Sequence, residues 1–349
     1  MQQIDAGLVG YGKAGEIFHA PLITATPGLG LKSVVERHAQ RSRQRYPQAT
    51  IVRSIDELLD DSNIELVVIA TPNISHYELA HKALAAGRHV VVDKPFTITS
   101  AEADSLIALA QEKNLILTVF HNRRLDGDFH TVQSLLRQGL LGRLVHYESA
   151  FDRFRNYLKE DAWREQPLPG AGLLYDLGAH LIDQAVQLFS LPSSVTADVR
   201  RQREGAEADD AFDVWLGYDE VKVRLQASIL AREPRPRFRL FGDQGSFVKF
   251  GLDPQEAMLQ QGALPGDPQW GMEPPEQWGT LNTNVGDLHI EGGIETLPGR
   301  YEDYYQNVYE AITSGAPLLV SPIEARNVIR IIELAQQSDE EQRTIPCGW

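Results

Sequence analysis

Apolar and polar positions follow one pattern before residue 122 and another after it. In the first part, short apolar runs predict buried strands, at 4–9, 29–35, 64–70, 89–92 and 115–120. Helical patterns separate these runs, at 15–25, 42–46, 75–86 and 100–113. Ser100 is the expected N-cap of the last helix. Buried strands that alternate with helices predict an α/β domain with a doubly wound parallel sheet.

After residue 122 the pattern becomes typical of antiparallel pairing. A helix at 129–137, a strand at 144–151 and a helix around residues 172–185 come first. Closely spaced strands with hairpin turns follow, at 212–218, 221–230, 238–241 and 246–250. Residues 262–300 predict an extended loop or a short edge hairpin, and helices are expected at 301–314 and 323–338. We therefore predict two domains, 1–122 and 123–349, the second of the α+β class.

Composition narrows the class of protein. The chain has 349 residues, 42% of them hydrophobic and 23% charged, as in soluble globular proteins. Its net charge of −15 argues against nucleic acid and anionic membranes as partners. No run approaches the length of a membrane span, and the first residues lack a secretory signal pattern. The single cysteine excludes an internal disulfide, so we expect a reducing, cytoplasmic location.

A glycine-rich turn lies between the first predicted strand and the first predicted helix. Gly10, Gly12 and Gly15 form the pattern G-x-G-x-x-G, in the context expected of a dinucleotide-binding fingerprint. The N-terminus of the helix would attract a pyrophosphate. We therefore expect cofactor contacts from the whole loop: Gly10, Tyr11, Gly12, Lys13, Ala14 and Gly15. A plain strand-to-helix turn is the alternative interpretation.

The end of the second strand bears on the choice of cofactor. Glu36 lies about 20 residues after the glycine turn, where a carboxylate commonly binds the adenosine ribose. A carboxylate there repels a 2′-phosphate and favours NAD. Arg37 is adjacent and would pair with such a phosphate. We predict that both residues contact the cofactor, which is NAD, with NADP as the alternative.

Polar residues also follow the later strands of the first domain. Ligands bind at the carboxyl ends of parallel strands, so further cofactor contacts are expected there. The candidates are Thr71, Pro72, Asn73, His76, Asp93, Lys94 and Asn122. Alternatively, Lys94 has no functional role: its alkyl chain packs along the strand end and its ammonium group lies in water. Arg123 is a candidate for substrate binding or for an interdomain ion pair, and His19 is assigned no chemistry.

One helix carries Asp176, His180 and Asp183 at helical spacing among apolar neighbours. A metal site, a salt bridge and a proton-transfer site are the three interpretations. No His or Cys pair at ligand spacing supplies further metal ligands, so we predict no metal. A surface salt bridge would leave the apolar neighbours unexplained.

Three motifs together resemble the glucose–fructose oxidoreductase/inositol dehydrogenase (Gfo/Idh/MocA) family. They are the glycine turn, Asp-Lys-Pro at 93–95 where the family usually has Glu-Lys-Pro, and GAGLLYDLGAHLID at 170–183. The stretches VVVDKPFT and VFHNRR more closely resemble the scyllo-inositol dehydrogenase branch. The resemblance implies an N-terminal Rossmann domain and a C-terminal domain with a large, mostly antiparallel open sheet. It also implies that the second domain binds substrate and forms a homodimer or homotetramer through that sheet.

The resemblance also implies an activity. Members of the family are NAD(P)-dependent oxidoreductases, and the expected reaction moves a hydride between nicotinamide and a secondary hydroxyl or ketone of an inositol-like cyclic polyol or sugar. The family's catalytic residues match Lys94, Asp176 and His180, which would also touch substrate. Lys94 would stabilise charge on the reacting oxygen and His180 would exchange its proton. Asp176 would bind substrate hydroxyls or orient His180, and Asp183 would support the helix.

Further substrate contacts are expected from Arg123, Arg153 and Trp163, although a surface loop explains the last two equally well. Two other functions remain open. One is a non-catalytic regulator that binds a dinucleotide on the same fold. The other is a reductase of an unrelated carbonyl or pyrrole-type substrate. The presence of both Lys94 and His180 favours an enzyme.

Overall fold

A computed structural model describes residues 2–160 and 162–349, which form two compact units. The first unit comprises Met1–Leu125, Gln255–Trp270 and Arg300–Ile329. The second comprises Asp126–Pro254, Gly271–Gly299 and Arg330–Trp349. The predicted boundary at residue 122 lies close to the first crossing, but two later segments return to the first unit. They return because their side chains pack there, as Tyr305 does against Phe120.

The first unit is built on a six-stranded parallel sheet in the order β3-β2-β1-β4-β5-β6. Its strands are β1 Ile4–Val9, β2 Leu29–Val35, β3 Thr50–Val52, β4 Ile64–Ile69, β5 His89–Val92 and β6 Leu117–Val119. This is the Rossmann order, and the predicted doubly wound fold is confirmed. The sequence analysis did not predict the short strand β3.

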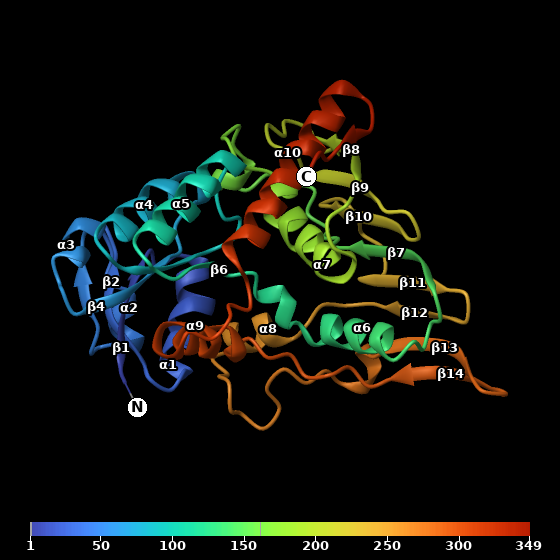
Figure 1. Ribbon diagram of the computed structural model, residues 1–349, viewed down its shortest axis with the longest axis horizontal. Coiled ribbons are helices and arrows are strands. Elements are labelled where there is room, and N and C mark those ends of the chain that lie inside the picture. The colour runs from blue at the N-terminus through green and yellow to red at the C-terminus, as the bar shows by residue number, and fades with distance from the viewer. Residues whose placement is uncertain (1, 161) are drawn as a thin grey trace. The chain divides into compact units, whose positions relative to one another are not determined.

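Helices cover both faces of this sheet. They are α1 Ala20–Ala25, α2 Ser42–Arg45, α3 Ile55–Leu59, α4 His76–Ala85, α5 Ser100–Glu112, α8 Gln255–Gln260 and α9 Glu302–Ser314. In Figure 1, α4 and α5 lie side by side on one face, with α1 and α9 on the other. The N-cap of α5 is Thr99 and not Ser100 as predicted. Thr99 and Glu102 each accept a hydrogen bond from the other's backbone N–H, a capping box.

The second unit is built on a nine-stranded sheet in the order β14-β13-β12-β11-β7-β10-β9-β8-β15. Among the described strands of this sheet, only β7 and β10 pair in parallel, so the predicted mostly antiparallel sheet is confirmed. The strands are β7 Leu144–Ala150, β8 Ser194–Arg200, β9 Ala211–Gly217, β10 Lys222–Ser228, β11 Phe238–Gly242, β12 Gly245–Lys249, β13 Gly279–Val285, β14 Leu288–Ile294 and β15 Ile345–Pro346. The predicted edge hairpin within 262–300 is β13–β14.

Two helices pack against one face of the nine-stranded sheet, α6 Gly127–Arg137 and α7 Ala179–Phe189 (Figure 1). The Phe129 ring of α6 stacks on Phe238, and Phe189 of α7 meets Tyr147 edge to face. On the other face, alternation along β9 leaves Trp215 partly exposed while its neighbours are buried. The helix α10 Pro322–Glu341 contributes residues to both units.

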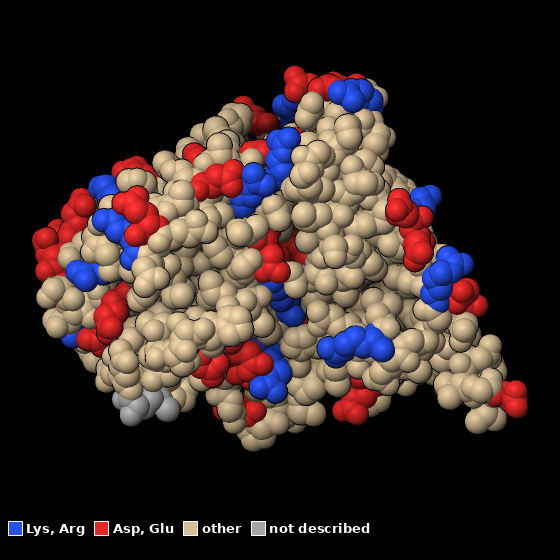
Figure 2. All heavy atoms as spheres, viewed as in Figure 1, with Lys and Arg blue, Asp and Glu red and all other residues tan. Residues whose placement is uncertain are grey.

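Surface charge and helix hydropathy bear on the predicted absence of nucleic-acid and membrane partners. Figure 2 shows acidic and basic side chains interspersed, and the described Lys and Arg residues form no continuous area on the face it draws. Among the described helices, none combines the length and hydropathy needed to cross a bilayer. The predicted absence of these partners stays a prediction.

Candidate active site

The glycine turn after β1 has the geometry that its sequence predicts. Gly10 has φ +101°, and a side chain there would place its Cβ 2.7 Å from the Ala70 carbonyl oxygen. A Cβ at Gly15 would lie 2.2 Å from the Gly10 carbonyl oxygen. Only glycine therefore lets the turn and the following helix approach so closely. A Cβ at Gly12 would meet nothing within 4 Å, so the space beside this residue is open to a ligand.

The carboxyl ends of four strands lie side by side in the first unit. Val9 pairs with Ile69, Ile69 with Val92, and Val92 with Val119. The segments that follow these strands therefore begin at one edge of the sheet. They carry the remaining first-unit candidates: Thr71, Pro72, Asn73, His76, Asp93, Lys94, Asn122 and Arg123. This is the edge at which open parallel sheets bind ligands.

His76 ties two of these segments together. Its ring is buried, with Nδ1 2.8 Å from the Pro95 carbonyl oxygen and Nε2 3.0 Å from that of Thr71. Burial lowers the pKa of His76, and a neutral ring has one N–H to donate. Both ring nitrogens therefore face main-chain carbonyls, and a contact between His76 and the cofactor stays a prediction. Its role is to hold the segment around the cis Lys94–Pro95 peptide.

Glu36 directly follows β2, where it was predicted, but its carboxylate makes contacts within the protein. Its carboxylate is buried and accepts hydrogen bonds from Arg41 N (2.9 Å), Ser42 N (2.9 Å) and Ser42 Oγ (2.5 Å). Burial favours the neutral acid, but the Ser42 and Arg41 hydrogen bonds and the Arg41 charge outweigh it and lower the pKa of Glu36. Both oxygens are thus engaged within the turn that starts α2. Arg37, by contrast, is exposed.

An acidic residue that the sequence analysis missed joins two predicted cations. Lys13 Nζ lies 2.8 Å from Glu256 Oε1, and an Arg123 guanidinium nitrogen lies 3.0 Å from Glu256 Oε2. Glu256 belongs to α8, which packs on the turn Gly15–His19 (η1). Arg123 therefore forms an ion pair with a residue beyond the predicted first domain. No local motif marks Glu256, so pattern reasoning had no means to find it.

In the second unit, Asp176 lies on a π-helical turn, Leu174–Gly178 (η5), directly before α7. His180 and Asp183 on α7 are buried, whereas the Asp176 side chain is 20% exposed. Such widened turns are frequent at functional sites. Arg164, another residue that the sequence analysis missed, places Nε 3.4 Å from Asp176 Oδ1 and its guanidinium 4.5 Å from the Trp163 ring centre. Arg153 is exposed, with its guanidinium 5.1 Å from the centre of the Phe151 ring.

Asp209 holds the start of this helix. Its Oδ2 accepts a hydrogen bond of 2.7 Å from Leu174 N. Gly172 has φ +90°, and a Cβ there would lie 1.9 Å from Asp209 Oδ1. The carboxylate therefore explains why residue 172 must be glycine. Burial raises the pKa of Asp209 to about 6, against the lowering effect of its backbone hydrogen bonds.

The contacts of Asp176 bear on the salt-bridge and metal interpretations of the Asp176–His180 helix. Asp176 pairs with Arg164, a contact that sequence spacing did not suggest. Within the described residues, no three His, Cys, Asp or Glu side chains gather in a way that could hold a metal ion. The structure thus gives the metal interpretation no support.

Comparison with models of known protein families shows to which family the chain belongs. Residues 4–121 match the model described as "Oxidoreductase family, NAD-binding Rossmann fold", and residues 133–347 match "Oxidoreductase family, C-terminal alpha/beta domain". The chain belongs to the Gfo/Idh/MocA family. The predicted family and its nicotinamide-binding Rossmann domain are thereby confirmed, and the chain is an oxidoreductase of that family.

Its relatives within the Gfo/Idh/MocA family cover nearly the whole chain. The oxidoreductase YdgJ of Escherichia coli (strain K12) is 42% identical over 342 residues, 98% of both chains. The scyllo-inositol 2-dehydrogenase (NADP(+)) IolW of Bacillus subtilis (strain 168) is 38% identical over 98% of this chain and 95% of its own. Among solved structures, the Bacillus subtilis oxidoreductase yvaA has a TM-score of 0.95 at 38% identity, covering 99% of this chain and 98% of that one.

The buried carboxylate of Asp209 should make the stability of this Gfo/Idh/MocA member depend on pH. A native pKa near 6 exceeds the usual 3.8, so the native state holds this proton more tightly than the unfolded state. The stabilisation is complete below about pH 4 and is lost as pH rises through about 6, a change of about 3 kcal/mol.

Urea unfolding of Asp209→Asn and wild type between these pH values measures the effect. We expect the wild type to lose more stability than the variant over this interval. Asp198→Asn, an exposed carboxylate on β8, is the control. Parallel stability curves for wild type and Asp209→Asn would contradict the assignment.

Proposed function

We propose that this oxidoreductase is an NAD(P)-dependent dehydrogenase that acts on a secondary hydroxyl of a cyclic polyol or sugar, with inositols as first candidates. The observation that carries the proposal is Lys94, two residues after the end of β5, at the sheet edge that also bears the glycine turn. A dinucleotide fits this edge, because Gly10 and Gly15 permit the close turn and the space beside Gly12 is open. The named scyllo-inositol dehydrogenase relative supports the substrate class.

Each proposed catalytic residue has a distinct task. A bound nicotinamide dinucleotide supplies the hydride acceptor for oxidation and the donor for reduction. The Lys94 ammonium stabilises negative charge on the reacting oxygen. His180 takes the proton of the hydroxyl, since imidazole exchanges protons near neutral pH. Asp176 accepts hydrogen bonds from neighbouring substrate hydroxyls, and Arg164 fixes the orientation of its carboxylate.

A substrate panel tests this function. Inositol stereoisomers and aldoses are incubated with NAD or NADP, and the absorbance of the reduced cofactor is followed. Turnover of at least one cyclic polyol or sugar is expected. Dinucleotide binding without turnover of any compound would favour the regulator, and turnover of only unrelated carbonyls would favour the reductase.

We further propose that the cofactor site accepts a 2′-phosphate, so that NADP is used at least as well as NAD. Glu36, which would repel that phosphate, has both oxygens engaged inside its own turn. The neighbouring Arg37 is exposed and carries the charge that would pair with it. IolW, whose name specifies NADP(+), gives independent support.

Arg37→Ala tests the choice of cofactor. Loss of a charge-assisted hydrogen bond to phosphate should lower kcat/KM for NADP about 10- to 100-fold and leave kcat/KM for NAD within about 2-fold. Arg43→Ala, an exposed arginine of α2, is the matched control. An equal effect on both cofactors would remove Arg37 from cofactor selection, and a wild type that rejects NADP would restore Glu36 as the selective residue.

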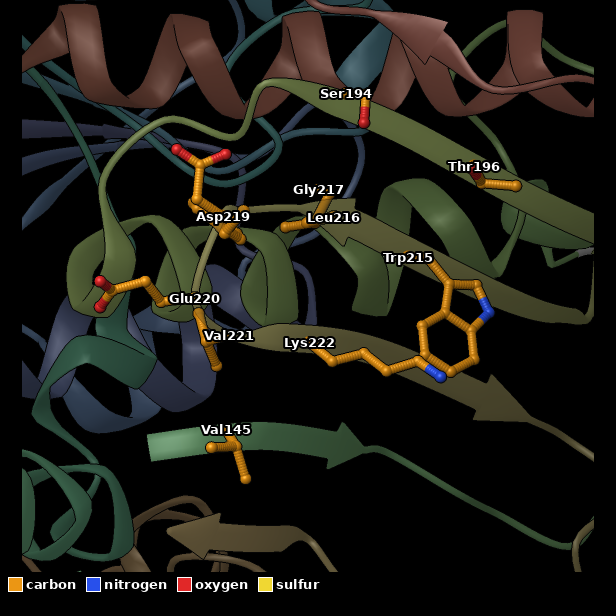
Figure 3. A pocket seen from close by; sticks show the side chains of 11 residues that line it. Val145, Ser194, Thr196, Trp215, Leu216, Gly217, Asp219, Glu220, Val221 and Lys222 are labelled. Atoms are coloured by element: carbon orange, nitrogen blue, oxygen red, sulfur yellow. The ribbon is translucent and has the colours of Figure 1, made fainter. Parts of the chain in front are cut away.

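The partly exposed face of the nine-stranded sheet is the proposed contact with a second copy of the chain. Figure 3 shows Lys222 extended along the Trp215 ring, beside Thr196, and Lys222 Nζ lies 4.4 Å from the ring centre. These residues line a surface pocket of about 410 Å³. The Arg224 guanidinium also lies 4.7 Å from the Trp215 ring centre, and tryptophan and arginine are enriched at interface centres. We propose a homodimer or homotetramer formed through this face.

Light scattering after gel filtration tests the assembly. The wild type should have a mass that is a multiple of 39.0 kDa. Trp215→Asp buries a charge in the contact and should weaken association at least about 10-fold. Ile323→Asp changes an exposed apolar residue of α10 in the first unit, outside this sheet, and should leave the mass unchanged. A monomeric wild type, or a Trp215→Asp variant that assembles normally, would contradict the proposal.

A further inference from the structure

A buried chain of polar groups lies behind Lys94 within the first unit. The Tyr305 hydroxyl of α9 is 2.6 Å from His19 Nδ1, and His19 Nε2 is 3.6 Å from Asp93 Oδ1. The same Asp93 oxygen accepts a hydrogen bond of 2.9 Å from Lys94 N. Tyr305 and His19 are fully buried, and Asp93 is 8% exposed. These polar contacts therefore run from the protein interior to the backbone of Lys94, the residue that we propose as the catalytic cation.

The direction of the hydrogen bonds follows from the chemistry of the groups. Burial raises the pKa of Tyr305 well above its usual value, so the hydroxyl keeps its proton and donates it to His19 Nδ1. With Nδ1 accepting this hydrogen bond, the ring has its N–H on Nε2, which faces Asp93. Asp93 accepts the hydrogen bond from Lys94 N and lies within ion-pair distance of His19 Nε2. The Tyr305 hydroxyl, the His19 ring and Lys94 N are thus all oriented toward the Asp93 carboxylate.

Asp93 remains charged although it is buried. Burial favours the neutral acid, but the polar contact with His19 and the positive charge of Lys94 outweigh it and hold the pKa of Asp93 below its usual value. Tyr304 on α9 is a further titratable group that faces Asp93. A buried carboxylate is stable only with such partners, so these groups together maintain a fixed negative charge next to Lys94.

We propose that Tyr305, His19 and Asp93 form a positioning relay that fixes the backbone of Lys94 and keeps a charged carboxylate on the residue directly before it. The relay rests on the proposed function, because it matters for turnover only if Lys94 is catalytic. None of its three members needs to touch substrate or cofactor. Asp93, predicted from sequence as a cofactor contact, and His19, to which the sequence assigned no chemistry, therefore both act through Lys94.

Kinetics of relay variants form the first test. Asp93→Asn and His19→Phe should lower kcat about 10- to 100-fold, with KM for NADP within about 3-fold, as is usual when a group that supports a reacting residue is lost. Tyr305→Phe removes one hydrogen bond and should lower kcat about 3- to 10-fold. His19→Gln keeps an N–H donor toward Asp93 and should retain most of the activity. Tyr309→Phe is the matched control. Tyr309 lies on the same helix as Tyr305, and its hydroxyl donates a hydrogen bond to the Gln2 carbonyl, outside the relay.

The ionisation of Lys94 is the second test, and it does not require turnover. The full-length chain is reductively methylated with ¹³C-formaldehyde, and the Lys94 signal, assigned with Lys94→Arg, is titrated by NMR. The pKa of Lys94 should fall by about 1 in Asp93→Asn, because an adjacent opposite charge is lost. Tyr305→Phe and His19→Phe should shift it in the same direction.

The two tests separate the relay from the proposed function. A wild type without dehydrogenase turnover overturns the proposed function, and the NMR titration still decides whether the relay acts on Lys94. An unchanged Lys94 titration in Asp93→Asn and His19→Phe overturns the relay. Wild-type kcat in both variants overturns it as well. Equal losses of kcat in Tyr305→Phe and Tyr309→Phe would show a general effect of packing and would also overturn it.

Discussion

Replacing Lys94 by alanine is expected to lower kcat about 100- to 1,000-fold, while the Kd for the dinucleotide changes less than about 3-fold. The ammonium group is proposed to act on charge that develops during the reaction and contributes little to ground-state binding. Steady-state rates and quenching of the reduced cofactor's fluorescence measure the two quantities separately. Lys113→Ala, at the exposed C-terminal end of α5, serves as the control.

Lys94→Arg refines this expectation. Arginine keeps the positive charge but spreads it over a planar group that does not fit the position of an ammonium. Its kcat should lie between those of wild type and Lys94→Ala. A Lys94→Ala enzyme that turns over its best substrate near the wild-type rate would show that this lysine has no catalytic role.

Replacing His180 by alanine is expected to lower kcat about 100- to 10,000-fold, the usual contribution of a general acid or base. It should also remove the limb of the pH–rate profile that reports ionisation of the proton acceptor. The ring is buried on α7, where solvent does not readily replace it as a base.

Profiles of kcat against pH for wild type and variant measure this effect. Asp183→Asn, one turn further along α7, should affect stability but leave the profile's shape unchanged. A limb that persists unchanged in His180→Ala would assign the proton transfer to another group.

The elements that the sequence predicted well are those with local signatures. The valine-rich runs of β4 and β5 are buried on both faces. These strands can therefore be predicted from their continuous apolar sequence without tertiary information. The glycine turn is likewise local, because Gly10 and Gly15 are required by contacts with the neighbouring strand end and with the turn itself. Lys94 was found because the segment that follows a parallel strand already lies at a known edge of the sheet.

The residues that sequence reasoning missed act through contacts between distant parts of the chain. Glu256 meets Lys13 and Arg123 although more than 100 positions separate it from either one. Asp209 reaches Leu174 from a loop that shows no periodic pattern. Glu36 illustrates the converse case: its position matched a known spacing, but the following turn folded back and engaged its carboxylate.

Transfer of deuterium tests the central claim most directly, namely that the chain moves a hydride between a ring carbon of a polyol and nicotinamide. The protein is incubated with NADP and scyllo-inositol deuterated at its ring carbons, and the reduced cofactor is analysed by NMR and mass spectrometry. We predict one deuterium at C4 of the nicotinamide ring and a slower rate than with unlabelled substrate. Reduced cofactor without deuterium, or no reduced cofactor with any polyol or sugar of the panel, would contradict the account.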